Sequence, residues 1–387
     1  MRNLIDELQS LQNETVNIVS SVTEKDYRQQ FHPDLSPIGW HLGHCIFTES
    51  YWIKEQLLGE QVVDDSLESL YVPELSTKQS RGSVLPDKSE LLEWAKNTQS
   101  ENRSILESVS QKKSSHQLLK NDYLLHFLIQ HYSQHVETMH MVLTEIQIQN
   151  VDAKFSPCNI SNILATNKPK KECVTIEAAF YNTGSDNKYF PYDNEHPAHT
   201  INLNSFNIAT SPVSNSEYLE YMNFGGYSIK NYWSDAGWEW CNNNKNNHPH
   251  HWRLQNDNNG YGINHEGPYL LEENYPVHGL SYYEAEAYAK WAGARLPYEF
   301  EWEVACKKNL LQKKSLVWEW CNNTFHPYSG FSPYPYAGYS VPYFDDDHYV
   351  LKGGSSITKK HILRSSFRNY YTADKRHIFA GMRLVYP

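Results

Sequence analysis

Residues 121–149 read NDYLLHFLIQHYSQHVETMHMVLTEIQIQ and keep apolar side chains at helical spacing along the whole stretch. In an α-helix, positions i and i+4 lie on one face, so His131 and His135 project together, as a bidentate metal clamp requires. His140 follows His131 by nine residues, a rotation that ends about 180° away, on the opposite face. The stretch therefore predicts a long helix with two histidines placed for a metal ion. The alternative is that they only cap or solvate one face of a bundle.

Three further stretches upstream show the same helical periodicity. They are LIDELQSLQNETVNIVSSV (4–22), LSPIGWHLGHCIFTESYWIKEQLL (35–58) and LPDKSELLEWAKNTQSENRSILESV (85–109). Ser36–Pro37 makes a plausible start for the second of them, with proline at the first helical position. The segment YVPELSTKQSRGSVLP (71–86) is expected to be a loop. Four long amphipathic helices with modest connections predict a helical bundle over residues 1–150.

The helical periodicity of the sequence ends after residue 150. Residues 151–172 lack clear periodicity and are expected to be a linker. From residue 173 to 387, short apolar runs are broken by Gly, Pro and Asn, which favours an irregular α+β domain held by many aromatic side chains. The clearest helices there are expected in SYYEAEAYAKWAGARLP (281–297) and FEWEVACKK (300–308).

Composition excludes several classes of protein. The net charge of −11 argues against a nucleic-acid or anionic-membrane surface, so neither partner is expected. No apolar run approaches the roughly 18–20 residues of a membrane span. The N-terminal MRNLIDELQSLQNETV carries acids and is unlike a secretory signal. The six cysteines are scattered without a CxxC pair, so we expect a cytoplasmic protein with mostly reduced thiols.

A second pair of closely spaced histidines lies in SPIGWHLGH, residues 36–44. His41 and His44 are three residues apart on the second expected helix. A bundle brings facing helices to within about 8–10 Å, so one of them could complete a three-histidine metal site with His131 and His135. Imidazole suits Fe, Zn, Cu and Ni alike, and the ligand type alone does not choose the metal.

Two groups of motifs carry a resemblance to a known enzyme family. SPIGWHLGHCIFTESYW (36–52) and HYSQHVET (131–138) resemble the DinB-type bundle of the ergothioneine-type sulfoxide synthases. The second half resembles their C-terminal partner, the formylglycine-generating-enzyme fold, which is C-type-lectin-like. The stretches concerned are YDNEHPAHTINLNSFNIATSPVSNSEYLEYMNFGGY (192–227), PVHGLSYYEAEAYAKWAGARLPYEFEWEVA (276–305), VWEW (317–320) and GGSSITKKHILRSSFRNYYTADKRHIFAGMRLV (353–385). The resemblance implies an α+β protein with a four-helix bundle (1–150), a linker (151–172) and this domain (173–387).

The resemblance also implies a cofactor and a reaction. Family members are non-haem iron enzymes that use O2 to join a thiol to the imidazole of a histidine derivative such as hercynine. Carried over, the Fe(II) ligands are His44, His131 and His135, while His41 sits beside the site without binding. Three neutral histidines leave about three positions on the metal for a thiolate, an imidazole nitrogen and O2. The expected product has a new C–S bond and a sulfoxide.

Residues for the imidazole substrate carry over by motif. Gln134, just before the second histidine of the HxxxH motif, corresponds to a glutamine that hydrogen-bonds the imidazole. Asn369 and Tyr370 in SFRNYY match the residues that cradle the trimethylammonium and carboxylate groups. An aromatic face near a quaternary amine contributes roughly 1–2 kcal/mol when desolvated. An ordinary helix position for Gln134 and a turn role for Asn369 are the plainer alternatives.

The carboxylate of the thiol substrate needs cations. Lys78 and Arg81 in STKQSRG have the spacing of two basic family residues after the second helix, and Lys375 and Arg376 in ADKRH are the C-terminal counterparts. Arginine is suited to bidentate carboxylate capture. Solvated loop charges are the alternative interpretation of these residues.

The sequence departs from the family pattern in several places. Tyr371 stands where the actinobacterial branch has an acidic residue that contacts γ-glutamylcysteine, and Phe331 lies at or near the position of a proton-donating tyrosine. A phenylalanine donates no proton, so another phenol would have to serve. The candidates are Tyr334, Tyr336, Tyr339 and Tyr71. Cys321 stands alone after VWEW, which disfavours the copper-dependent synthesis of formylglycine.

Four functions remain open on these observations. The first is the iron-dependent coupling of a cysteine-like thiol to hercynine or histidine. The second is selenoneine synthesis, in which a selenosugar replaces the thiol. The third is a metal-dependent thiol transferase that consumes no O2, as other DinB-type bundles suggest. The fourth is a binding protein that uses its aromatic C-terminal domain for recognition.

Overall fold

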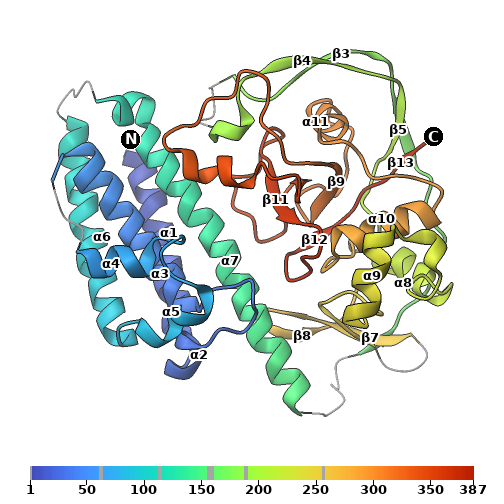
Figure 1. Cartoon of the computed structure of the whole chain (residues 1–387), viewed down its shortest axis with the longest axis horizontal. Coiled ribbons are helices and arrows are strands. Elements are labelled where there is room, and N and C mark those ends of the chain that lie inside the picture. Colours follow the sequence, from blue (N-terminus) through green and yellow to red (C-terminus); the bar gives the residue numbers. More distant parts are fainter. Residues whose placement is uncertain (1, 61–63, 112–115, 155–160, 187–190, 255–257) are drawn as a thin grey trace. The chain divides into compact units, whose positions relative to one another are not determined.

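The computed structural model describes residues 2–60, 64–111, 116–154, 161–186, 191–254 and 258–387. The chain divides into two compact units, Met1–Phe155 and Ser156–Pro387. The first is helical and the second combines short strands with helices (Figure 1). This α+β organisation confirms the predicted fold class. In the described ranges, no helix combines the length and apolar character that a membrane span requires.

The first unit is a four-helix bundle. Helix α1 packs against α6 and α7, and α3 packs against the same two helices (Figure 1). Helix α3 continues directly into a π-helical segment, Tyr51–Leu57. The four bundle helices are α1 (Arg2–Ser21), α3 (Ile38–Ser50), α6 (Lys88–Gln111) and α7 (Tyr123–Lys154). Each of them overlaps a stretch where the periodicity predicts a helix, although α1 begins earlier and α6 and α7 end later than predicted.

The short helices of this unit include two corrections to the sequence predictions. The predicted loop 71–86 contains α5 (Lys78–Val84), whose N-cap Thr77 accepts a hydrogen bond from the Ser80 backbone. Seven residues are too few for a periodicity signal. Pro37 is the N-cap of α3 rather than its first helical residue. The other short helices are α2 (Glu24–Arg28), α4 (Asp65–Tyr71) and a 3₁₀ segment (Gln117–Asp122).

A buried polar cluster ties the four bundle helices together. The fully buried carboxylate of Glu49 on α3 accepts hydrogen bonds from Gln12 of α1 (2.8 and 3.0 Å), Asn102 of α6 (3.1 Å) and Tyr132 of α7 (2.7 Å). A buried network of this kind specifies one register of the helices, because a slip would leave these polar groups without their partners in a low-dielectric interior. Tyr132 is next to His131, so the network also fixes the register of the histidine-bearing helix.

The Glu49 cluster predicts a pH dependence of stability. Burial raises the pKa of Glu49 above its ordinary value of 4.5, so just above that pH the folded chain keeps a proton that the unfolded chain releases. The stability that this group contributes is present below pH 4.5 and is lost as the pH rises through its folded pKa. In urea titrations followed by far-UV circular dichroism, the metal-free wild type should lose stability in this window relative to Glu49→Gln. Parallel pH profiles for the two chains would contradict this prediction.

The second unit is built from small sheets. Their strand orders are β1-β7-β6 with β8 paired to β7, β11-β10-β9-β12, β13-β5-β2, and β3-β4. All described pairs are antiparallel except β9 with β12. The strands are β1 (Asn162–Ile163), β2 (Cys173–Ile176), β3 (Ala179–Thr183), β4 (His199–Leu203), β5 (Phe206–Ala209), β6 (Trp252–Leu254), β7 (Asn259–Asn264), β8 (Gly267–Tyr269), β9 (Trp318–Thr324), β10 (His348–Lys352), β11 (Asn369–Thr372), β12 (Ala380–Gly381) and β13 (Val385–Tyr386).

The helices of the second unit are α8 (Asn215–Asn223), α9 (Asp235–Asn244), α10 (Tyr282–Trp291) and α11 (Glu299–Lys307). The two expected helices correspond to α10 and α11. Helix α10 ends earlier than predicted, because Gly293 adopts a left-handed φ of 68° just beyond the C-cap. The expected linker 151–172 contains the end of α7 and strand β1. Its residues 155–160 lie outside the described ranges.

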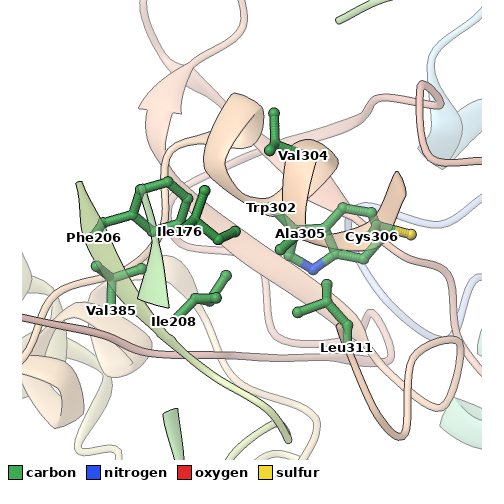
Figure 2. Close-up of a cluster of buried hydrophobic side chains, with 9 residues drawn as sticks. All are labelled: Ile176, Phe206, Ile208, Trp302, Val304, Ala305, Cys306, Leu311 and Val385. Atoms are coloured by element: carbon green, nitrogen blue, oxygen red, sulfur yellow. The ribbon is translucent and has the colours of Figure 1, made fainter. Parts of the chain in front are cut away.

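One hydrophobic core of the second unit lies between α11 and the three-stranded sheet. Ile176, Phe206, Ile208 and Val385 project from β2, β5 and β13 toward α11 (Figure 2). On the helix side, Trp302 is almost fully buried, and its Nε1–H donates to the Glu319 carboxylate at 2.7 Å. The buried indole can remain in an apolar core because its one polar group is satisfied.

Candidate metal centre

Three histidines of the first unit converge in the bundle interior. Their ring nitrogens lie within 4.8 Å of one another: His44 comes from α3, and His131 and His135 come from successive turns of α7. The Nε2 atoms of His44 and His131 are 3.1 Å apart. Two imidazole ligands at right angles on one ion, each bound at about 2.1 Å, would be separated by about 3 Å. The donor set therefore fits a single transition-metal ion.

A backbone contact fixes the tautomer of His44. Its Nδ1 lies 2.7 Å from the carbonyl oxygen of Tyr71. Because a carbonyl can only accept, the Nδ1 atom must carry the proton, which leaves the lone pair of the neutral ring on Nε2. That is the nitrogen that faces His131. Hydrogen bonds to the remote nitrogen of a ligand histidine commonly set ring orientation in this way.

Burial keeps the histidines neutral. It lowers the pKa of His44 to about 4 and holds the pKa values of His131 and His135 well below the usual 6.5. An unprotonated imidazole is the form that binds a metal, so the group is ready for coordination at neutral pH. His41 lies beside the group, with its Nδ1 atom 3.1 Å from the Nδ1 atom of His135. This contact joins α3 to α7.

Tyr71 packs directly against the helix that carries His44. A Cβ atom on Gly43 would lie 2.2 Å from the Tyr71 ring, so only glycine permits this approach. The Tyr71 side chain is fully buried, and its hydroxyl has no hydrogen-bond partner among the described residues. Burial raises its pKa, so the phenol keeps its proton. Of the four candidate proton donors, Tyr71 alone belongs to the same unit as the histidines.

The other candidates in the first unit have different surroundings. Gln134 is half-buried on α7, and its backbone carbonyl accepts a hydrogen bond from Thr138. Lys78 is exposed at the start of α5 and donates to the Asp34 carbonyl at 2.8 Å. Arg81, by contrast, is only 3% exposed and donates to several internal acceptors. A substrate carboxylate would have to displace these bonds, so the structure gives Arg81 an internal role.

The SFRNYY motif lies at strand β11. Asn369 is the first residue of β11, and its Oδ1 atom accepts a hydrogen bond from the Tyr370 backbone. The Tyr370 hydroxyl donates to the Tyr339 carbonyl at 2.5 Å, and its ring stacks on Phe325 with centroids 4.2 Å apart. Tyr371 is half-buried, with its ring edge-on to that of His377.

The two C-terminal cations differ in their partners. Arg376 is held in a buried ion pair with Glu284, with Nε–Oε2 at 3.0 Å, and donates further to Asn246 and the His248 carbonyl. Lys375 forms an ion pair with Asp374 at 3.0 Å. Arg376 therefore holds together parts of the second unit that are distant in the sequence. The sequence pattern gave no sign of these contacts.

The remaining phenol candidates lie in the chain between β9 and β10. Tyr339 stacks on Tyr192 with centroids 4.0 Å apart, Tyr336 is 43% exposed and Tyr334 is half-buried. Phe331 packs edge-on against Phe344. All four belong to the second unit, whereas the three histidines belong to the first.

Comparisons with known proteins define the family. The DinB superfamily matches residues 7–139, and the sulfatase-modifying factor enzyme 1-like domain matches 162–315 and 316–387. The chain is an enzyme, and it belongs to the family with the sulfatase-modifying factor enzyme 1-like domain, combined here with a domain of the DinB superfamily.

Two curated relatives align with almost the whole chain, and a third aligns with about half of it. It is 28% identical to the hercynine oxygenase of Mycolicibacterium thermoresistibile, over 100% of this chain and 94% of that protein. The hercynine oxygenase of Mycolicibacterium smegmatis is 27% identical, over 99% and 98%. Ergothioneine biosynthesis protein 1 of Schizosaccharomyces pombe is 29% identical, over 51% of this chain and 28% of that protein.

Proposed function

We propose that the protein is an O2-dependent non-haem iron(II) sulfoxide synthase. It forms a C–S bond between a cysteine-like thiol and the imidazole of hercynine or histidine. The observation that carries this proposal is the group of three neutral histidines, of which His44 is buried and His131 and His135 are partly buried. Each offers one ring nitrogen, and these three atoms lie within 4.8 Å of one another. The full-length similarity to proteins named hercynine oxygenase supports the choice of substrate class.

In this proposal His44, His131 and His135 hold the Fe(II). When bound, the ion supplies electrons to O2 and lowers the pKa of a coordinated thiol. The chain supplies orientation. The Tyr71 carbonyl keeps the Nε2 atom of His44 unprotonated, and the buried position of the His44 ring strengthens its local electrostatic interactions.

We assign the substrate contacts on the motif matches. Gln134 orients the imidazole, while Asn369 and Tyr370 recognise the trimethylammonium and carboxylate groups. Tyr71 is our first choice for the proton donor, because its phenol is protonated, buried and without an internal partner among the described residues. Lys78 and Lys375 are our choice for the carboxylate of the thiol, because Arg81 and Arg376 are occupied by several internal acceptors.

The sulfur donor is the less defined substrate. Tyr371 is a half-buried phenol where an acidic residue would contact γ-glutamylcysteine, so it offers no carboxylate to an amino group. This favours a sulfur donor that lacks the amino group by which γ-glutamylcysteine would be recognised. A selenosugar, as in selenoneine synthesis, is the second candidate for the donor. A metal-dependent thiol transfer without O2 is the rival reaction.

The decisive experiment is anaerobic reconstitution with Fe(II), followed by addition of O2, hercynine and a panel of donors. Cysteine, γ-glutamylcysteine and a selenosugar form the panel. We expect O2 uptake only when both substrates are present. For a thiol, one O2 is consumed and one water released, so the product carries one more oxygen and two fewer hydrogens than the two substrates combined. A product formed without O2 would replace this proposal with the transferase.

A further inference from the structure

Three planar groups are stacked beside the metal centre. The guanidinium carbon of Arg81 lies 3.8 Å from the ring centre of Trp40. Trp40 in turn stacks on His44, with ring centroids 4.7 Å apart and planes within 13°. The Trp40 ring therefore contacts both the Arg81 guanidinium and the His44 ring.

A single stretch of backbone anchors every member of this stack. At the end of α4 and in the segment that leads to α5, the carbonyl oxygens of Leu70, Tyr71, Pro73 and Ser76 act as acceptors. Leu70 accepts from the Trp40 indole at 2.7 Å, and Tyr71 accepts from His44 at 2.7 Å. Arg81 donates to the carbonyls of Pro73 and Ser76 at 2.9 and 3.0 Å. The stack and the 70–76 backbone thus form one hydrogen-bonded assembly.

The remaining donors of Arg81 complete the assembly. Nε donates to the Ser76 hydroxyl at 3.0 Å, and Nη1 donates to the Ser36 hydroxyl at 2.5 Å, just before α3 begins. Guanidinium is planar and presents donors in a fixed fork, so it can stack and hydrogen-bond at once. A lysine at this position could keep the charge but neither the plane nor the fork.

We propose that Arg81 and Trp40 are positioning residues for the metal centre, which set the ring plane of His44, and that Arg81 does not bind substrate. The hydrogen bond to Tyr71 fixes the direction of the Nδ1 atom of His44, and the stack fixes the plane in which the ring lies. Together these two constraints aim the Nε2 atom before a metal arrives, so less rotamer freedom is lost on binding. This inference rests on the proposed metal site.

The test measures metal affinity separately from turnover. Anaerobic titration with Co(II), followed by its visible absorption, gives a dissociation constant without any reaction. Loss of a residue that orients a ligand typically weakens metal binding by about 10- to 100-fold. We expect losses in this range for Arg81→Lys and Trp40→Leu, whereas Trp40→Phe, which keeps an aromatic face, should lie closer to wild type.

A matched control separates the two possible roles of Arg81. Lys78→Met removes a cation three residues away that donates to the Asp34 carbonyl rather than to the stack, and Co(II) affinity should not change. If Arg81 bound the substrate carboxylate, Arg81→Lys would leave Co(II) affinity intact and raise the KM for the thiol, which would overturn the inference. Should Arg81→Lys fail to fold by circular dichroism, wild-type affinity in Trp40→Leu would overturn it equally. A wild-type chain that binds no Co(II) would instead remove the proposed metal site.

Discussion

His135→Ala is expected to abolish both metal binding and O2-dependent turnover while the chain stays folded. The ring of His135 is one of three neutral donors to the proposed ion, with its centroid 4.6 Å from that of His131 and 4.8 Å from that of His44. Two imidazoles cannot replace three, because the open positions would be filled by water and the site would lose its affinity and its fixed geometry. Co(II) titration and O2 uptake with hercynine and a thiol measure the two effects.

The same helix offers a matched control. His140 lies on the other face of α7, with its Nδ1 atom 2.8 Å from the Val136 carbonyl, outside the histidine group. His140→Ala removes an imidazole from the same helix and should leave metal affinity and turnover near wild type. Full activity in His135→Ala would refute the metal centre. A loss in both variants would point to damage to α7 rather than to a lost ligand.

The long helices and two of the three histidines of the candidate site could be predicted because they are local features of the sequence. The i, i+4 spacing alone places His131 and His135 on one face. His44 was different, since periodicity places both His41 and His44 on the facing helix and only the family motif separates them. The structure separates them physically: the backbone contact of His44 leaves its Nε2 atom toward His131. A hydrogen bond from His44 to a backbone carbonyl 27 residues later cannot be predicted from a local sequence pattern.

The roles of Arg81 and Trp40 could not be predicted for a related reason. Arg81 donates a hydrogen bond to Ser36, which lies 45 residues earlier in the sequence. Arg81 itself lies in α5, a helix within the segment that the sequence predicts to be a loop. The spacing of Lys78 and Arg81 matched the family motif, yet the buried arginine and the exposed lysine have different partners. Helix α8 was overlooked although Ser214 and Glu217 form a capping box, the same signal that marks α10 at Ser281 and Glu284.

Buried ion pairs hold the second unit together where strands are short. They join residues that are distant in the sequence, so composition and periodicity give no sign of them. Each pair connects different elements, and this cross-linking explains how strands of two to seven residues form a defined domain. The pairs are Glu195–Arg364, Glu284–Arg376, Glu299–Arg368, Glu303–Lys352 and Glu319–Arg383.

Arg368→Met should destabilise the second unit by about 3–5 kcal/mol, the usual cost of leaving a buried charge without its partner. Arg368 is 1% exposed and contacts both oxygens of Glu299, at 2.7 and 2.9 Å. It also donates to the carbonyls of Asn194 and His326. The substitution therefore strands a carboxylate and two backbone acceptors together. Guanidinium unfolding followed by tryptophan fluorescence measures the loss.

A more exposed pair nearby provides the comparison. Arg295 also forms two bonds to one carboxylate, that of Glu301, but its side chain is 41% exposed. Water already competes for this pair at the Arg295 side chain, and Glu301 keeps a hydrogen bond from the Tyr298 backbone at 2.8 Å, so Arg295→Met should cost less than Arg368→Met. The double variant Arg368→Met/Glu299→Met should recover much of the stability lost in the single variant, because it removes the uncompensated charge. Equal losses for Arg368→Met and Arg295→Met would mean that burial does not govern the strength of these pairs.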